Sequence, residues 1–427
     1  MGVPFAFLHA ADLHLDSPFR GLTRVPPAVR ERLKESTFAS FQRLALLARR
    51  EKVDFVVLAG DLYDAADRSL RAQLRMQRTL AELAEDGIRT FVVHGNHDPA
   101  NGWQAKLEWP KLVHFFGSGE VEAVPAYRRD GELAAYVYGI SYPEANVTDN
   151  LAARYRARPG APFHLAVLHA NVDGSAGHDD YAPCKLAELA SGDFQYWALG
   201  HIHDRRVLNE YPHVVYPGNI QGRSVRETGP KGAYVVRVDE AGRIEMAFRD
   251  TADVLWSEKT VSIEGAEREQ DLKARLLEAI EQARGEADHR PVVLRIRVEG
   301  RGALHDRLQR ETAAAEWLEE LREWCGSPEE RDDWVWADSL VIRTRAPASE
   351  DGREDEDGFL GVLARAGREA AADPERSREL LDGALEQVRR HPKLREWSAA
   401  RSAEEREELI GRAVELAAWL LRDREER

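Results

Sequence analysis

Five short polar motifs, each placed directly after an apolar run, constrain the fold of this chain more than any other feature. The motifs are Asp12-Leu13-His14, Gly60-Asp61, Gly95-Asn96-His97-Asp98, His169 and Gly200-His201-Ile202-His203. The apolar runs before them have the length of buried strands, and helical patterns separate the first three. In open α/β sheets, ligands bind beyond the carboxyl ends of the strands, so the five motifs are expected to meet at one edge. This order predicts an α/β layered core.

The apolar runs and the patterns between them define the expected elements of this core. The runs are residues 5–8, 55–58, 91–93, 165–168 and 196–199. Helical spacing of apolar residues predicts helices over 27–49 and 70–84. Residues 234–238 and 244–248 are expected to form a hairpin with residues 239–243 as its turn.

The residue types in the motifs indicate a metal site. Carboxylate, amide and imidazole groups are oxygen and nitrogen ligands, which suit divalent Mn, Fe, Zn or Mg. The candidate ligands are Asp12, His14, Asp61, Asn96, His169, His201 and His203. Seven ligands are too many for one tetrahedral ion and suit two ions about 3.5–4 Å apart that share one carboxylate. The other motif-like histidines, His9, His94, His114 and His305, are expected to be ordinary partly buried residues.

Charge and composition limit the classes of protein to which the chain can belong. The net charge is −15, which taken alone argues against a nucleic-acid binder. A local site can override net charge, and two dications with two carboxylates leave the site positive and attractive to phosphate. Two cysteines are too few for a disulfide framework. No apolar run approaches the ~18 residues of a membrane span, and no signal peptide is expected, so the prediction is a soluble cytoplasmic protein.

Changes in composition and hydrophobic pattern along the chain predict three segments, with bounds 1–255, 256–345 and 346–427. The second segment has the order β-α-β-α-β, and Ser327-Pro328-Glu329-Glu330 has the pattern of a helix-starting capping box. Its strand 292–298 alternates, with Arg295 and Arg297 on one face. The third segment begins with an acidic linker at 350–357, followed by amphipathic helices that start at Asp373-Pro374 and at Ser402.

Taken in order, the five motifs resemble the calcineurin-like metallophosphoesterases, over residues 5 to 203. Residues 9–16 (HAADLHLD) and 60–64 (GDLYD) are similar to the DNA-repair exonuclease branch, the SbcD family. Residues 217–223 (PGNIQGR) and 227–232 (ETGPKG) are similar to its YhaO subgroup. The resemblance implies a two-sheet α/β metallophosphoesterase core, a small α+β capping domain and a helical C-terminal tail.

The resemblance also implies roles for single residues. One metal would be held by Asp12, His14, Asp61 and His203, and the other by Asp61, Asn96, His169 and His201, with Asp61 bridging. His97 would stabilise the developing charge or protonate the leaving oxygen, with Asp98 orienting its ring. Some relatives carry a second histidine where this chain has Asp64, which puts that histidine's contribution in doubt here.

The leading functional hypothesis is a two-metal-dependent DNA exonuclease or endonuclease, with Mn²⁺ as the expected metal. The alternatives are a small-substrate phosphodiesterase or phosphatase, a non-catalytic scaffold, and a DNA-end tether. Arg205, Arg223 and Arg226 are candidate phosphate contacts, for which ordinary surface charge is an equal alternative. The resemblance implies DNA ends, an SMC-like ATPase and a second copy of the chain as partners. The tail helices are expected to dock on that ATPase or, with nearly equal weight, on the nuclease core.

Overall fold

The computed structural model describes residues 3–19, 25–174, 181–347 and 359–386, with several further residues between 405 and 417. The chain divides into two compact units. The first comprises Met1–Val261, Lys273–Arg297 and Thr312–Val341, and the second comprises Ser262–Leu272, Val298–Glu311 and Ile342–Arg427. The expected acidic linker at 350–357 and the start of the helix at Ser402 lie outside the described residues.

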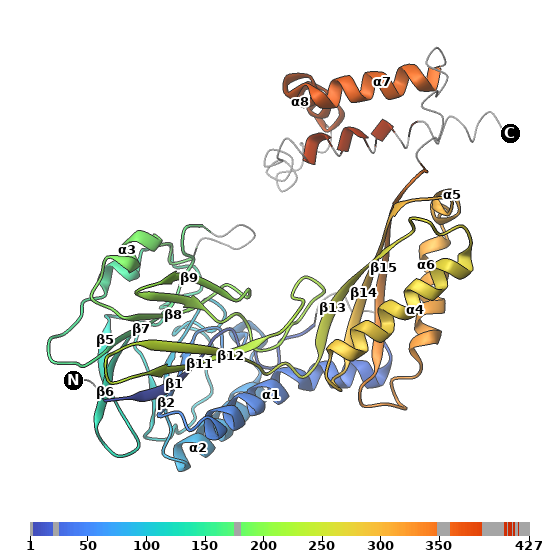
Figure 1. Cartoon of the computed structure of the whole chain (residues 1–427). Coiled ribbons are helices and arrows are strands. Elements are labelled where there is room, and N and C mark those ends of the chain that lie inside the picture. The colour runs from blue at the N-terminus through green and yellow to red at the C-terminus, as the bar shows by residue number, and fades with distance from the viewer. Residues whose placement is uncertain are drawn as a thin grey trace. The chain divides into compact units, whose positions relative to one another are not determined.

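Among its described residues, the first unit contains two six-stranded sheets (Figure 1). The first has the order β12-β11-β1-β2-β3-β4, in which β1 to β4 are parallel and β11 and β12 form the expected hairpin. Its strands are β1 (Phe5–Ala10), β2 (Phe55–Ala59), β3 (Arg89–Val93), β4 (Val113–Phe115), β11 (Gly232–Val238) and β12 (Ile244–Asp250).

The second sheet has the order β5-β6-β7-β8-β10-β9, in which β6, β7, β8 and β10 are parallel. Its strands are β5 (Glu122–Tyr127), β6 (Leu133–Gly139), β7 (His164–His169), β8 (Tyr196–Gly200), β9 (Arg206–Glu210) and β10 (His213–Tyr216). The apolar runs at 134–140, 165–168 and 196–199 predict β6, β7 and β8, but no such run marks the short or half-exposed strands β5, β9 and β10.

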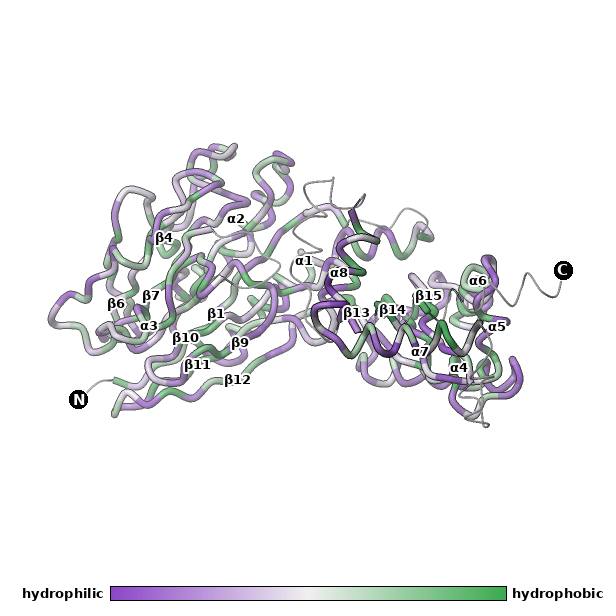
Figure 2. The backbone as a smooth tube through the Cα atoms, turned by 90° about the horizontal axis from the view of Figure 1, so that it is seen from above, coloured by the Kyte–Doolittle hydropathy of each residue, from purple (hydrophilic) through white to green (hydrophobic). Residues whose placement is uncertain are grey.

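The two sheets pack face to face, and helices and loops cover their outer faces. In β1, Phe5 and Phe7 enter the core between the sheets, whereas Leu8 and Ala10 face the helices α1 (Pro27–Arg50) and α2 (Leu70–Glu85). The outer face of the second sheet is covered by η2 (Ala152–Arg154), α3 (Leu186–Ala190) and their flanking loops. Strands buried on both faces are continuously apolar, which explains the runs in the sequence. In Figure 2 hydrophobic residues concentrate on the strands, and the surface loops are mostly hydrophilic.

A three-stranded sheet follows, with the order β13-β14-β15. Its elements are β13 (Leu255–Ser262), α4 (Glu269–Glu286), β14 (Val292–Arg301), α5 (His305–Leu308), α6 (Ala313–Cys325) and β15 (Val335–Arg345). This is the β-α-β-α-β order predicted from the sequence, with the short additional helix α5 before α6. Within the first unit, Val29 and Leu33 of α1 share an apolar cluster with Trp256, Trp334 and other residues of these strands.

The structure differs from two expectations for this region. The predicted capping box at Ser327 forms a turn and not a helix start, because its hydroxyl donates to the Glu329 carboxylate and β15 begins a few residues later. Arg295 and Arg297 share one face of β14 as predicted, but both form ion pairs with Glu258 of β13. The single carboxylate of Glu258 therefore offsets part of the positive charge on this face.

The C-terminal helices pack on one another in the second unit. Asp373 caps α8 (Pro374–Ala384) by accepting hydrogen bonds from the backbone N–H groups of Glu375 and Arg376, which confirms the predicted start. The preceding helix α7 (Phe359–Ala372) approaches the 405–417 segment so closely that a Cβ on Gly367 would lie 2.3 Å from the Val414 side chain. None of the described helices combines the length and the apolar character needed to cross a bilayer.

The aromatic cluster between the sheets gives a test of the core. Phe7 is fully buried, stacks on Phe55 with ring centroids 5.4 Å apart, and meets the Tyr196 ring edge-on at 5.1 Å. We expect Phe7→Ala to lower the free energy of unfolding by about 3–5 kcal/mol. The reason is that loss of the ring leaves a cavity, which the two packed sheets cannot close. Urea unfolding followed by circular dichroism measures this. Leu46→Ala, at a side chain that is 58% exposed, is the control and should change the value by less than about 0.5 kcal/mol.

Candidate metal centre

Both sheets deliver candidate ligands to the same place. From the first sheet, Asp12 and His14 follow β1, Asp61 follows β2 and Asn96 follows β3. From the second sheet, His169 is the last residue of β7, and His201 and His203 follow β8. The carboxyl ends of five parallel strands therefore carry all seven predicted ligands.

Several of these ligands have an unusual backbone conformation. The φ angle is +52° at Asp12, +42° at His14, +52° at Asp61 and +98° at His201. Positive φ is uncommon outside glycine, and such strain persists only where the surrounding structure holds it. Here the neighbouring loops hold each other, since the Asp12 N–H donates to the Gly60 carbonyl and the His14 N–H to the Asp61 carbonyl. Strain concentrated at four of the seven residues is typical of a functional site.

Glycines in the motifs let these groups approach one another. A Cβ on Gly95 would lie 2.4 Å from an Asp61 carboxylate oxygen, and a Cβ on Gly200 would lie 1.8 Å from the Ala59 carbonyl oxygen. Neither position has room for a side chain. The glycines of the Gly-Asn-His-Asp and Gly-His-x-His motifs are therefore steric requirements of the packed site.

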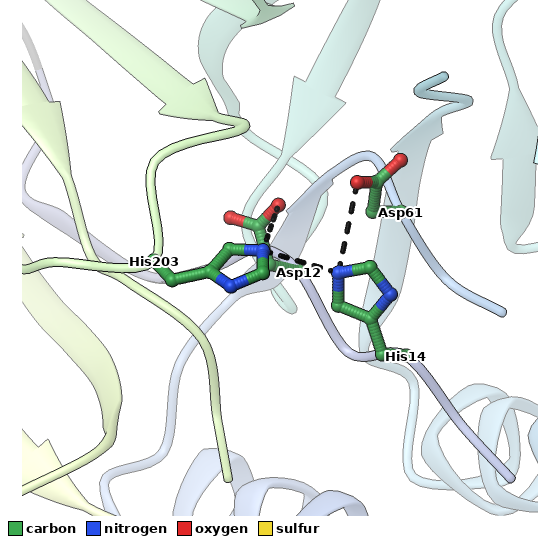
Figure 3. Close-up of side chains that lie close together, drawn as sticks. All are labelled: Asp12, His14, Asp61 and His203. Atoms are coloured by element: carbon green, nitrogen blue, oxygen red, sulfur yellow. Dashed lines mark hydrogen bonds and ion pairs between the residues drawn. The ribbon is translucent and has the colours of Figure 1, made fainter. Parts of the chain in front are cut away.

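Four predicted ligands form one compact cluster (Figure 3). Asp12, His14, Asp61 and His203 each offer one ligand atom, and all four atoms lie within 4.8 Å of one another. His14 Nε2 is 3.2 Å from His203 Nε2 and 3.6 Å from Asp61 Oδ2. His203 Nε2 is 3.9 Å from Asp12 Oδ1. This is the set that the resemblance assigned to one metal.

Hydrogen bonds on the outer side of the His14 and His203 rings determine which nitrogen of each ring carries the proton. His14 Nδ1 lies 3.2 Å from the Asp64 carboxylate, and His203 Nδ1 lies 2.8 Å from the Glu227 carboxylate. An ionised carboxylate only accepts hydrogen bonds, so both Nδ1 atoms carry the proton. Burial is the main reason that the pKa of His14 falls to about 3. The ring is therefore neutral, and its Nε2 atom carries a lone pair. A lone pair directed at a second imidazole nitrogen 3.2 Å away fits a cation between the two rings.

The second predicted set is gathered around His169. Its Nδ1 atom donates to the Ala59 carbonyl at 2.9 Å, and its Nε2 atom faces Asn96 Oδ1 at 3.0 Å and Asp61 Oδ2 at 3.5 Å. Burial lowers the pKa of His169, but the carboxylates of Asp61 and Asp12 outweigh it and raise the pKa to about 9. Negative potential of this kind favours a cation.

His201 contacts His169 of this second set through its ring and Asp12 of the first set through its backbone. The ring lies beside that of His169, with centroids 5.2 Å apart, and the backbone N–H donates to the Asp12 carboxylate at 3.1 Å. Asp61 Oδ2 lies 3.6 Å from His14 and 3.5 Å from His169, so one carboxylate oxygen faces both donor sets. That is the placement a bridging ligand requires.

His97 is held by a different residue from the one expected. Asp98 was predicted to orient its ring, but the buried Asp98 carboxylate instead contacts His94 Nδ1 at 2.9 Å and accepts the Gly95 N–H at 2.9 Å. His97 Nδ1 lies 2.8 Å from the carboxylate of Asp64. The correction has a geometric reason: Asp98 turns back into the bend of its own loop, whereas Asp64 comes from the loop after β2 and lies beside His97. Asp64 thus contacts both His14 and His97.

The environment of His97 suits a proton donor. Burial lowers its pKa, but the hydrogen bond to Asp64 and the charges of Asp61 and Asp64 have the larger combined effect and raise it above the ordinary value. The side chain is 46% exposed, in contrast to the buried His14 and His169. The ring therefore combines a held proton with access to a bound substrate.

The three candidate phosphate-binding arginines have different surroundings. Arg223 is half-buried. Its positive charge contributes to lowering the pKa of His14 and opposes the rise in the pKa of His97, so it lies beside the site. Its Nε atom has no hydrogen-bond partner within the described part of the chain. Arg205 is exposed and stacks on the Phe248 ring at 4.1 Å, and Arg226 is exposed on the same loop as Arg223.

Two residues of the site, Asp64 and Glu227, had no assigned role in the sequence analysis. Asp64 stands three residues after Asp61, where only its difference from a histidine was noted. Glu227 stands in the motif at 227–232, which carried a resemblance but no chemistry. The signal for both was present: an acidic residue in a short motif near histidines is a candidate for orienting their rings.

The position of Asp61 gives a direct test of the shared carboxylate. We expect Asp61→Ala to lose both ions, because one oxygen of this carboxylate faces both donor sets. Metal content of the purified full chain after Mn²⁺ loading and gel filtration, measured by mass spectrometry, gives the stoichiometry. Asp67→Ala, at an exposed carboxylate in the 3-10 turn η1 (Ala65–Asp67), is the control and should retain both ions. Two ions retained in Asp61→Ala would rule out the bridge.

Comparison with known proteins agrees with this geometry. A model of the calcineurin-like phosphoesterase family matches residues 5–205, and a model of the middle domain of metallophosphoesterase YhaO matches residues 256–345. The chain is 39% identical over 404 residues to the metallophosphoesterase YhaO of Bacillus subtilis, an alignment that covers 94% of each chain.

More distant relatives have names that refer to DNA repair or to nuclease activity. The DNA double-strand break repair protein Mre11 of Methanopyrus kandleri is 28% identical over 294 residues, covering 63% of this chain and 61% of that protein. A component of the nuclease SbcCD of Bacillus subtilis is 26% identical over 257 residues, covering 52% of this chain and 63% of that protein. The chain belongs to the calcineurin-like metallophosphoesterases, in the YhaO subgroup of the branch that includes Mre11 and SbcD.

Proposed function

We propose that this chain is a two-metal-dependent phosphodiester hydrolase that cleaves DNA as an exonuclease or endonuclease. The observation that carries the proposal is the Asp61 carboxylate oxygen, which lies 3.6 Å from His14 and 3.5 Å from His169. DNA is the proposed substrate because relatives across this branch are named for DNA break repair or as components of a nuclease. In this proposal residues 1–255 are the nuclease domain, 256–345 the capping and DNA-recognition domain, and 346–427 a linker with a partner-binding tail.

The proposed ligand sets are those of the sequence analysis. Asp12, His14, Asp61 and His203 hold one ion, and Asp61, Asn96, His169 and His201 hold the other. Mn²⁺ is the proposed metal because it accepts mixed carboxylate, amide and imidazole ligands. The two ions supply Lewis-acid polarisation of the phosphate and an activated water nucleophile.

The remaining chemistry falls to residues around the ligands. His97 carries a proton on Nε2, the atom away from Asp64, and delivers it to the leaving oxygen of the cleaved diester. Asp64 keeps Nδ1 of that ring protonated and fixes its direction. Arg223 adds positive charge beside His14 and His97, where it attracts a phosphate despite the acidic net charge.

The activity itself is tested by comparing a DNA substrate with a small one. We expect the full chain to degrade linear duplex DNA with Mn²⁺ and to stop when a chelator is added. His97→Ala should lower turnover by about 10²–10⁴-fold while both ions remain bound, since His97 is not a ligand. His114→Ala, which changes a surface histidine paired with Glu122, is the matched control.

Other results point to the alternative functions. Cleavage of a chromogenic phosphodiester without cleavage of DNA would favour the small-substrate enzyme. DNA binding without metal-dependent cleavage would favour the end tether. Loss of an ion in His97→Ala would make His97 a ligand and contradict its proposed role.

The proposed setting is DNA repair in the cytoplasm, as a homodimer with an SMC-like ATPase subunit. The tail helices α7 and α8 are the proposed docking element for that ATPase. Val362 on α7 and Leu380 on α8 are 45% and 50% exposed, whereas Ala370 and Ile410 are buried. The two exposed apolar side chains are the proposed contact points for the ATPase.

Truncation tests the proposed tail function. We expect a chain that ends after Pro347, which retains the Ala346 carbonyl bonded by Arg301, to keep nuclease activity and melting temperature but lose binding to the SMC-like ATPase of the same organism. Leu380→Asp in the full chain should weaken that binding without removing the tail. A large fall in the melting temperature on truncation would show that the tail stabilises the rest of the chain and would contradict the docking role.

A further inference from the structure

The loop from Pro217 to Lys231, which joins β10 to β11, contains the motif to which no function has been given. Its contacts converge on His203 from two directions. Glu227 reaches the side chain of His203, and Lys231 reaches the main chain. We infer that Glu227 is a positioning residue that aims His203 at its metal ion and ties this ligand to Arg223.

One carboxylate serves three donors in this arrangement. Glu227 Oε1 lies 2.8 Å from His203 Nδ1, and Oε2 accepts hydrogen bonds from Asn219 Nδ2 at 3.0 Å and from the Arg223 backbone N–H at 2.6 Å. The Glu227 side chain is only 17% exposed, so water does not replace these bonds easily. The position of a metal ligand and the position of a substrate-facing arginine therefore depend on the same group.

Other residues of this loop contact the backbone carbonyl of His203. Lys231, which is 5% exposed, donates through Nζ to the His203 carbonyl at 3.0 Å. Gly218 has a φ of +76°, and a Cβ there would lie 2.6 Å from the same carbonyl oxygen. Because both the ring and the carbonyl are held, the direction of His203 Nε2 is set by this loop and not by the Gly-His-x-His motif alone.

The chemistry requires a carboxylate at position 227. An amide has one acceptor oxygen and one NH₂ donor, so glutamine can satisfy His203 Nδ1 or the Asn219 and Arg223 donors, but not both sides. A carboxylate behind a ligand histidine also fixes the tautomer and increases its basicity, and its loss typically costs 10–100-fold in metal affinity. The inference rests on the proposed role of His203 as a metal ligand.

The test is Mn²⁺ titration of the metal-free full chain by calorimetry, for the wild type and Glu227→Gln. We expect two sites in the wild type and, in the variant, about 10–100-fold weaker binding at one site with the other nearly unchanged. Occupancy of the weakened site in the variant should recover as Mn²⁺ is raised to saturation. Glu122→Gln, which changes a surface carboxylate paired with His114, is the matched control and should bind as the wild type does.

The possible results separate the two proposals. Wild-type affinity at both sites of Glu227→Gln would overturn the inference and leave the proposed function standing. No ion bound by the wild type would overturn both. If Glu227→Gln does not fold, Glu227→Asp keeps the charge but withdraws it by one methylene; weaker binding at one site supports the inference, and unchanged binding overturns it. Occupancy that saturating Mn²⁺ does not restore would indicate a structural role and would also overturn it.

Discussion

The buried carboxylate of Asp61 is the group on which the rest of the site depends. One of its oxygens accepts the His97 N–H at 2.9 Å, and the other faces His14 and His169. Its position requires β2 to lie between β1 and β3, so that the loops on either side close over it. Two buried carboxylates and several buried imidazoles in one place are costly to desolvate, and bound cations are the natural compensation. Such a cluster serves chemistry and not stability.

The fold and the seven candidate ligands were largely predictable because they rest on local patterns, whereas the division of the ligands into two sets came from the family resemblance. Strands buried on both faces give continuous apolar runs, and the polar residue that follows such a run must lie at the sheet edge. All seven candidate ligands were found in this way. The structure gathers Asp12, His14, Asp61 and His203 in one cluster, and it places His169 beside Asp61, Asn96 and the ring of His201. Their assignment to metals remains a proposal, supported by the distances around Asp61.

The interactions that the sequence did not reveal are those between loops far apart in the chain. Asp98 is adjacent to His97 in sequence, yet Asp64 from another loop makes the contact. The Ser327 pattern failed for a local reason, since a side-chain bond to Glu329 replaced the expected helix cap. The close approach of Gly367 in α7 to Val414 is another contact between residues far apart in the chain. Local sequence indicates which groups are available, but three-dimensional structure decides which of them meet.

The orientation of the histidines shows how far the site extends beyond its motifs. Three of the candidate ligand rings are each held at Nδ1 by a different acceptor: Asp64 for His14, the Ala59 carbonyl for His169, and Glu227 for His203. These acceptors come from the loop after β2, the end of β2 itself and the β10–β11 loop. A strand slipped by one residue would turn every such side chain to the opposite face. The candidate metal centre therefore depends on the registers of both sheets and on the long loop after β10 as much as on the ligands. A chain that carried the five motifs without these acceptors would have the donor atoms, but nothing would orient them.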